Sequence, residues 1–152
     1  MVTELPVFDT ARDEIQALFW DYWKAQTPTL TGGAPAMVQW QGVDSGEAPT
    51  PNAPWARFDL RHTLGRQATF GSRGHRRFLR KGLIQIQVFV PNSRGVGLSD
   101  AEKYSTIARD AFEGKGTPSG IWFRNAAIQE IGVNEGWFQM NVSVEFVYDE
   151  MK

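Results

Sequence analysis

The stretch that most constrains the fold is residues 82–90, where apolar and polar side chains alternate. One face would carry Ile84, Ile86, Val88 and Val90, and the other Gln85, Gln87 and Phe89. A period of two is typical of a β-strand with one buried face. Pro91 follows and lacks a backbone N–H, so we expect the strand to end there.

Residues 137–149 repeat this pattern over a greater length. The apolar positions are Phe138, Met140, Val142, Val144, Phe146 and Tyr148. Together with residues 120–133 they predict an antiparallel hairpin around Asn134-Glu135-Gly136, where a glycine is available for positive φ. A strand of about 13 residues would run ~44 Å, so we expect it to bend or to extend past its sheet. Residues 55–62 alternate in the same way and predict a further strand.

Two segments have helical periodicity instead. In residues 9–24 the apolar side chains Ala11, Ile15, Leu18, Phe19 and Tyr22 share one face, flanked by Trp20 and Trp23. This helix should end before Thr27-Pro28. In residues 99–113 the apolar face is Tyr104, Ile107, Ala108, Ala111 and Phe112. Ser99 and Glu102 have the spacing of a capping box at its start.

The order of these elements predicts an α+β fold in one domain spanning residues 1–152. We expect a mainly antiparallel, mixed sheet of about four to five strands, with two helices packed on one face. Residues 27–54 hold five prolines and form a long Pro/Gly-rich loop, within which Met37–Trp40 could be a short strand. Residues 63–81 form a basic loop, part of which could pair around Gln67–Phe70.

A search for catalytic chemistry finds no pattern that supports it. The chain has no cysteine, which excludes thiol nucleophiles, cysteine zinc sites and iron–sulfur clusters. His62 and His75 stand outside any metal-binding spacing, and the carboxylates are accounted for by helix starts or the chain end. The glycine-rich stretches lack the spacing of phosphate loops. We therefore expect a protein that is not an enzyme, with no catalytic, cofactor-binding or metal-ligating residues.

Membrane insertion and export are also not expected. No apolar run approaches the roughly 20 residues that span a bilayer. The first six residues include Glu4 and Pro6 and lack a basic segment, so they do not resemble a signal peptide. We expect the protein to be made and kept in a cytoplasm.

The charges are segregated along the chain, although the formal net charge is only −1. Residues 1–50 carry two bases and seven acids, a net of −5. Residues 57–81 carry eight bases and one acid, a net of +7, and residues 82–152 carry six bases and nine acids, a net of −3. The near-zero total is thus no evidence against a charged partner.

The basic segment 66–81 permits three interpretations. It could be a solvated loop, or it could contact nucleic acid through phosphate neutralisation and stacking on Phe70 or Phe78. It could also dock on acidic patches of other copies, as charge complementarity would favour. Six tryptophans are many for this length, and Trp55, Trp122 and Trp137 could cover a second apolar surface that assembly buries.

The ordered set of elements resembles the tail terminator proteins of long-tailed bacteriophages, the minor tail protein U-like group. The matching stretches are Pro54–Phe58, Arg80–Pro91, Gly95 and Gly97 before the helix that ends in Ala111-Phe112, Gly136–Gln139, and Val144–Glu150. The resemblance covers nearly the whole chain, and residues 27–54 match least.

This resemblance implies a structural role without catalysis. Such proteins form a ring, usually a hexamer, that caps the tail tube, ends its polymerisation and offers the surface on which the head docks. The implied partners are further copies, the tail tube protein, a head–tail connector or neck protein, and DNA passing through the bore without sequence specificity. The implied place is the virion tail, after synthesis in a bacterial host cytoplasm.

Two alternatives remain open: a ring protein of the neck or head-completion type, and a small nucleic-acid-binding module that uses residues 66–81. For a ring, we expect residues 63–81 to face the bore or the next subunit. The predicted lumen or interface residues are Arg73, Arg76, Arg77, Arg80 and Lys81.

Overall fold

Five strands form one mixed sheet in the order β1-β2-β3-β5-β4. The computed structural model describes residues 6–43, 52–92 and 97–152. The strands are β1 (Met37–Trp40), β2 (Trp55–Gln67), β3 (Arg77–Pro91), β4 (Trp122–Asn134) and β5 (Trp137–Met151). Only β1 and β2 pair in parallel, and the other three pairings are antiparallel. The predicted α+β class and mixed, mainly antiparallel sheet are confirmed.

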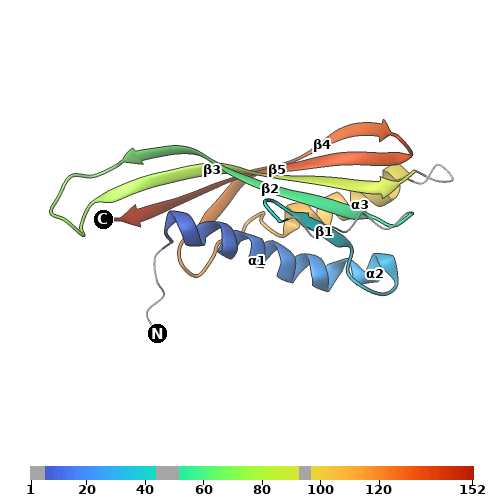
Figure 1. The fold of residues 1–152 in the computed structure, drawn as a ribbon, viewed down its shortest axis with the longest axis horizontal. Coiled ribbons are helices and arrows are strands. Elements are labelled where there is room, and N and C mark those ends of the chain that lie inside the picture. Colours follow the sequence, from blue (N-terminus) through green and yellow to red (C-terminus); the bar gives the residue numbers. More distant parts are fainter. Residues whose placement is uncertain (1–5, 44–51, 93–96) are drawn as a thin grey trace.

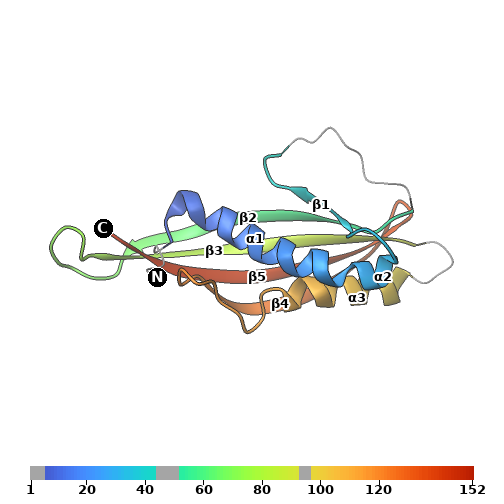
Figure 2. The same ribbon diagram turned by 90° about the horizontal axis from the view of Figure 1, so that it is seen from below.

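Both long helices lie on the same face of this sheet (Figure 1). They are α1 (Phe8–Gln26) and α3 (Gly97–Asp110), and a third helix, α2 (Pro28–Thr31), has only four residues. Figure 2, seen from the helix side, shows α1 and α3 side by side across the strands. Two helices packed on one face of the sheet are the arrangement that the sequence predicted, and the described residues place no helix on the opposite face.

The core lies between the helices and the alternating apolar side chains of the central strands. Ile84, Ile86, Val88 and Val90 on β3 are fully or almost fully buried, as predicted. From α1, Phe19 packs on Phe58 of β2 with 5.1 Å between ring centroids. Trp23, which the helical pattern placed at the edge of the apolar face, is fully buried. The buried face of α1 is therefore centred closer to Trp23 than the sequence pattern indicates.

Trp23 is buried because the segment after α1 folds over it. Its indole Nε1–H donates to the carbonyl oxygen of Ala36 at 2.8 Å. The hydroxyl of the buried Thr27 donates to the carbonyl oxygen of Trp23 at 2.7 Å and accepts from the N–H of Ala36 at 3.1 Å. These bonds satisfy polar groups at the end of α1 and lead the chain into β1.

Within the predicted loop over residues 27–54, the described residues hold more regular structure than expected. It contains α2, and the expected short strand Met37–Trp40 is confirmed as β1, paired with Trp55–Phe58. The part of this predicted loop at residues 44–51 lies outside the described residues.

The start of α3 differs from its prediction. The helix begins at Gly97, so the expected cap residue Ser99 lies within its first turn. A Cβ on Gly97 would stand 2.7 Å from Oδ1 of Asn92 and 3.0 Å from Cβ of Phe138. The missing side chain therefore lets the helix start directly against the end of β3 and the start of β5.

The β4–β5 hairpin is confirmed, with a two-residue turn. Asn134 pairs with Trp137, and the two residues between them, Glu135 and Gly136, have φ of 51° and 83°. Positive φ at both positions is the geometry of a type I′ turn, whose twist matches that of the flanking strands.

The prediction of a basic loop over residues 63–81 is wrong at both of its bounds. β2 continues to Gln67 and β3 already begins at Arg77, so only residues 68–76 connect the two strands. The reason is that β5 pairs with β3 along its whole length, from Arg77↔Met151 to Pro91↔Trp137. The long last strand therefore does not run past its sheet, because its neighbour is equally long.

Candidate assembly interface

The ends of β2, β3 and β5 project together beyond the start of α1, at the end of the molecule that also carries the C-terminus (Figures 1 and 2). We call this region, residues 61–81 and 147–152, the arm. It holds eight lysine and arginine side chains and two acidic ones. The rest of the described chain holds seven basic and twelve acidic side chains. Folding thus turns the charge segregation of the sequence into a basic end and an acidic body.

The five predicted interface residues all lie in the arm, but in different environments. Arg73 is exposed in the connection 68–76, and Arg76 stands at its base, half-buried. Arg77, Arg80 and Lys81 lie on β3 and not in a loop, which corrects the expectation for residues 63–81.

Arg80 is engaged within the subunit. Its Nε lies 3.0 Å from Oε1 of Glu150 on β5, and the two side chains are 19% and 6% exposed. The guanidinium also lies over the ring of Phe78, 5.6 Å from its centroid. A buried ion pair between neighbouring strands ties β5 to β3, so Arg80 is not available as a free surface charge.

The other four side chains differ in burial, since Arg73 and Arg77 are exposed and Arg76 and Lys81 are half-buried. Arg77 pairs with Asp149 at 3.5 Å, with both side chains largely exposed. The backbone of Arg76 exchanges hydrogen bonds with that of Lys152, at 3.1 and 2.9 Å, which fastens the C-terminus beside the loop. Among the described residues, Arg73 and Lys81 have no ion-pair partner. The arm therefore presents Arg73 and Arg77 to solvent and uses Arg80 for its own stability.

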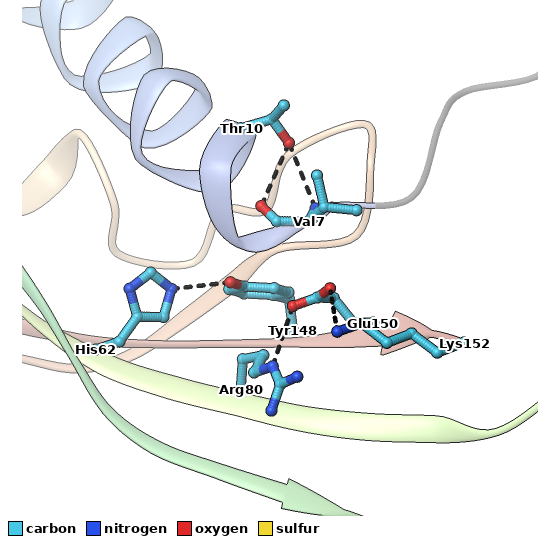
Figure 3. A network of polar contacts seen from close by, with 7 residues as sticks. All are labelled: Val7, Thr10, His62, Arg80, Tyr148, Glu150 and Lys152. Atoms are coloured by element: carbon cyan, nitrogen blue, oxygen red, sulfur yellow. Dashed lines mark hydrogen bonds and ion pairs between the residues drawn. The ribbon is translucent and has the colours of Figure 1, made fainter.

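A polar network that the sequence analysis did not find lies at the base of the arm (Figure 3). Nε2 of His62 on β2 shares a hydrogen bond of 2.8 Å with the hydroxyl of Tyr148 on β5. The ring of Phe8 at the start of α1 lies on His62, with 4.3 Å between centroids. His62 lies two residues after the buried Leu60, on the same face of β2. That spacing was the only sequence signal for the inward orientation of His62.

Burial controls the ionisation of both residues. The pKa of His62 is lowered, first by burial and then by the positive charges of Arg12 and Arg80, while Glu150 opposes the shift. Burial raises the pKa of Tyr148 to about 12, with a further contribution from Glu150. Both rings are therefore held in their neutral forms, which suits a hydrogen bond between them that supports the sheet.

A second cluster occupies the far end of the uncovered sheet face. Trp55 stacks on Phe89 with 4.3 Å between centroids, and Trp137 stands edge-on to Trp55 at 6.3 Å. The guanidinium of Arg57 lies over Trp55, 5.6 Å from its centroid. Trp122 is apart from this group and is exposed on β4. Trp55 is thus already buried within the subunit at 8% exposure, and Trp137 is half-buried, so of the three tryptophans only Trp122 is exposed. Burial of a second apolar surface on assembly stays a prediction.

The arm and the aromatic cluster are the two candidate regions for contact with a partner. Within residues 6–43, 52–92 and 97–152, no three histidine or acidic side chains gather to hold a metal ion. In the same residues, no helix combines the length and apolarity needed to cross a membrane. The arm and the aromatic cluster can supply charge complementarity, stacking and apolar contact.

The comparisons with known proteins support this fold. No protein-family model matches the sequence, and no curated protein matches it either. A solved protein whose name states no function aligns over 93% of this chain and 97% of its own, with TM-score 0.63 and 16% identity. A chain in a solved structure described as the virion of a native gene transfer agent (GTA) particle aligns over 91% of this chain and 97% of its own, with TM-score 0.52 and 14% identity. At such identities the similarity shows a shared fold.

Proposed function

We propose that this protein is a structural subunit of a phage-like particle that forms a ring on the end of the tail tube. The ring would stop further polymerisation of the tube and offer the surface on which the head docks. The protein would act in the virion tail, without catalysis, cofactor or metal. This specific role is proposed because the order of the sequence elements resembles that of tail terminator proteins.

The observation that carries the proposal is the structural likeness to a chain of the gene transfer agent virion, which spans 97% of that chain. This protein and one chain of that virion structure thus share a fold over most of both chains. The segregated charge adds to it, because a basic arm and an acidic body can meet in neighbouring copies. The partners proposed for the ring are its own copies, the tube protein, a head–tail connector or neck protein, and DNA in the bore.

A gene deletion tests the role directly. If the protein ends tube growth, particles assembled without it should carry tails of variable and excessive length, as measured by negative-stain electron microscopy. Expression of the wild-type gene in trans should restore uniform tails. Tails of normal, uniform length in the deletion strain would rule out a terminator.

The same experiment separates the neck-protein alternative. A head-completion ring would leave tail length unchanged in the deletion strain and would bind filled heads instead of tubes. Sedimentation of the purified protein with isolated tubes and with isolated heads distinguishes the two, since a terminator should pellet with the tubes.

One observation favours a second function, contact with nucleic acid. Arg66, Arg73 and Arg77 are exposed in the arm, which also carries the exposed ring of Phe70. Binding through these groups should weaken steeply as salt is raised, and Arg73→Ala with Arg77→Ala should flatten that slope. An absence of binding near physiological salt would exclude a nucleic-acid module.

A further inference from the structure

The side chain of Phe70 is 95% exposed, the most exposed of the large apolar side chains described. It stands in the loop at the end of the arm, in a chain that buries Phe19, Phe58 and Phe112 completely. A single aromatic ring on a charged loop is the kind of residue that anchors protein interfaces when a pocket receives it.

The loop around Phe70 is held in shape. The N–H of Ala68 donates to the carbonyl oxygen of Arg77 at 2.7 Å, and the N–H of Arg77 donates to the hydroxyl of Thr69 at 2.8 Å. Within the loop, the N–H of His75 donates to the carbonyl oxygen of Ser72 at 2.9 Å. An anchor on a preformed loop loses less conformational entropy on binding than one on an unstructured segment.

The opposite end of the molecule offers a groove. Two hollows, of about 650 and 470 Å³, lie between α2 and α3 and share Thr29, Leu30 and Lys103. Leu30, 38% exposed, and the half-buried Ile107 supply apolar wall, and Asp100 and Glu102 supply acids. Figures 1 and 2 both show α2 and the loop at residues 68–76 at opposite ends of the long axis.

We propose that the arm of one copy seats Phe70 in the groove between α2 and α3 of a second copy. The exposed Arg66, Arg73 and Arg77 of the arm then meet a groove whose charged lining is Asp100, Glu102 and Lys103. The rest of the described chain around this groove holds twelve acidic and seven basic side chains, so the charges favour the contact. The arm and the groove lie at opposite ends of one copy. The contact is therefore head-to-tail, and a pair of copies leaves one arm and one groove open for further copies. Closure of such a chain into a ring rests on the proposed function.

The absence of native cysteine makes the contact accessible to crosslinking. We would place one cysteine in the arm loop, Ser72→Cys, and one in the groove wall, Thr106→Cys, and treat the protein with a short bis-maleimide. A mixture of the two single variants should give a crosslinked heterodimer, and the double variant a ladder of larger species. Ser72→Cys mixed with Gln129→Cys, an exposed site on β4, is the matched control.

The outcomes are distinct. If the Ser72→Cys and Thr106→Cys pair crosslinks no faster than the control pair, the arm-in-groove contact is wrong. If Ser72→Cys alone forms dimers as fast as the mixture, the contact is symmetric and the proposal is also wrong. Crosslinking above the control that Phe70→Asp lowers more than about tenfold, and that Phe70→Leu largely keeps, supports it.

Folding and function can be separated from this contact. The side chain of Phe70 is exposed to solvent, so Phe70→Asp should keep the wild-type Tm. A lowered Tm would mean that the Phe70 side chain stabilises its own subunit instead. If the deletion strain makes overlong tails while no arm crosslink forms, the proposed function stands and the arm contact falls. If tails stay uniform while the crosslink forms, the contact stands and the terminator role falls.

Discussion

Arg80 on β3 and Glu150 on β5 form an ion pair with 3.0 Å between Nε and Oε1, in which Glu150 is only 6% exposed. Sequence reasoning assigned Arg80 to a bore or subunit interface, which stays a prediction, and within the subunit Arg80 joins two strands of one sheet. Glu150 also lies 3.9 Å from Lys152, measured between Oε2 and Nζ, so the same carboxylate contacts basic side chains on β3 and at the end of β5.

Loss of this partner should destabilise the protein. In Arg80→Met, the buried Glu150 keeps only its longer contact with Lys152, and we expect a loss of about 2–4 kcal/mol in the free energy of unfolding. Denaturant titration followed by tryptophan fluorescence measures it. Arg77→Met removes the more exposed pair with Asp149 and should cost less than about 1 kcal/mol. Equal losses in the two variants would contradict the structural role of Arg80.

Gly82 should tolerate no side chain. It lies on β3 opposite His62 and Phe146, and a Cβ there would clash with the Phe146 ring and the carbonyl oxygen of Arg61. We expect Gly82→Ala to lower stability by about 1–3 kcal/mol, because the core must shift to admit a methyl group. The matched control is Gly33→Ala, where nothing lies within 4 Å of the new Cβ. A Tm for Gly82→Ala equal to that of this control would show that the sheet accommodates the methyl group without loss of stability.

His62 should make stability depend on pH. Its pKa in the folded protein lies below the ordinary histidine value of 6.5, so the unfolded chain binds a proton at His62 first as pH falls. The stability from the neutral ring is fully present above pH 6.5 and decreases as pH falls toward the folded pKa.

The variant His62→Gln isolates this effect. The free energy of unfolding, measured from pH 7.5 downward, should fall less steeply in the variant than in the wild-type protein over the window below pH 6.5. Parallel curves for the two proteins would mean that His62 contributes nothing to the pH dependence.

Thr27 should be more important than its place at a helix end suggests. Its buried hydroxyl joins the carbonyl oxygen of Trp23 to the N–H of Ala36. Thr27→Val keeps the shape and removes both bonds, and we expect a loss of about 1–3 kcal/mol because the N–H of Ala36 loses its acceptor. Thr29→Val, at an exposed hydroxyl that bonds Gln26, should be nearly neutral. Urea unfolding of both variants decides whether the difference exists.

Much of the architecture could be read from periodicity. The alternation of residues 82–90 and 137–149 predicted strands that the structure contains, and the helical spacing of Ala11, Ile15 and Phe19 predicted a face that is buried. These patterns are reliable because burial of one face acts residue by residue along a strand or helix.

The environments of the predicted interface residues could not be read in this way. Arg73 and Arg80 look alike in a basic segment, yet one lies in solvent and the other binds a buried carboxylate. The difference depends on Glu150, 70 residues further along the chain. The partnership of His62 and Tyr148 likewise spans 86 residues, and no local pattern indicates it.

The sequence alone therefore determined the element types, the fold class and the concentration of basic side chains between residues 57 and 81. These properties depend on neighbours within a few residues, whose spacing sets which side chains share a face. Only the tertiary structure decided that β3 and β5 pair over 15 residues each, and that this pairing converts a supposed loop into an arm. Strand pairing brings distant residues together, so it decides which charges are buried in pairs and which remain for a partner.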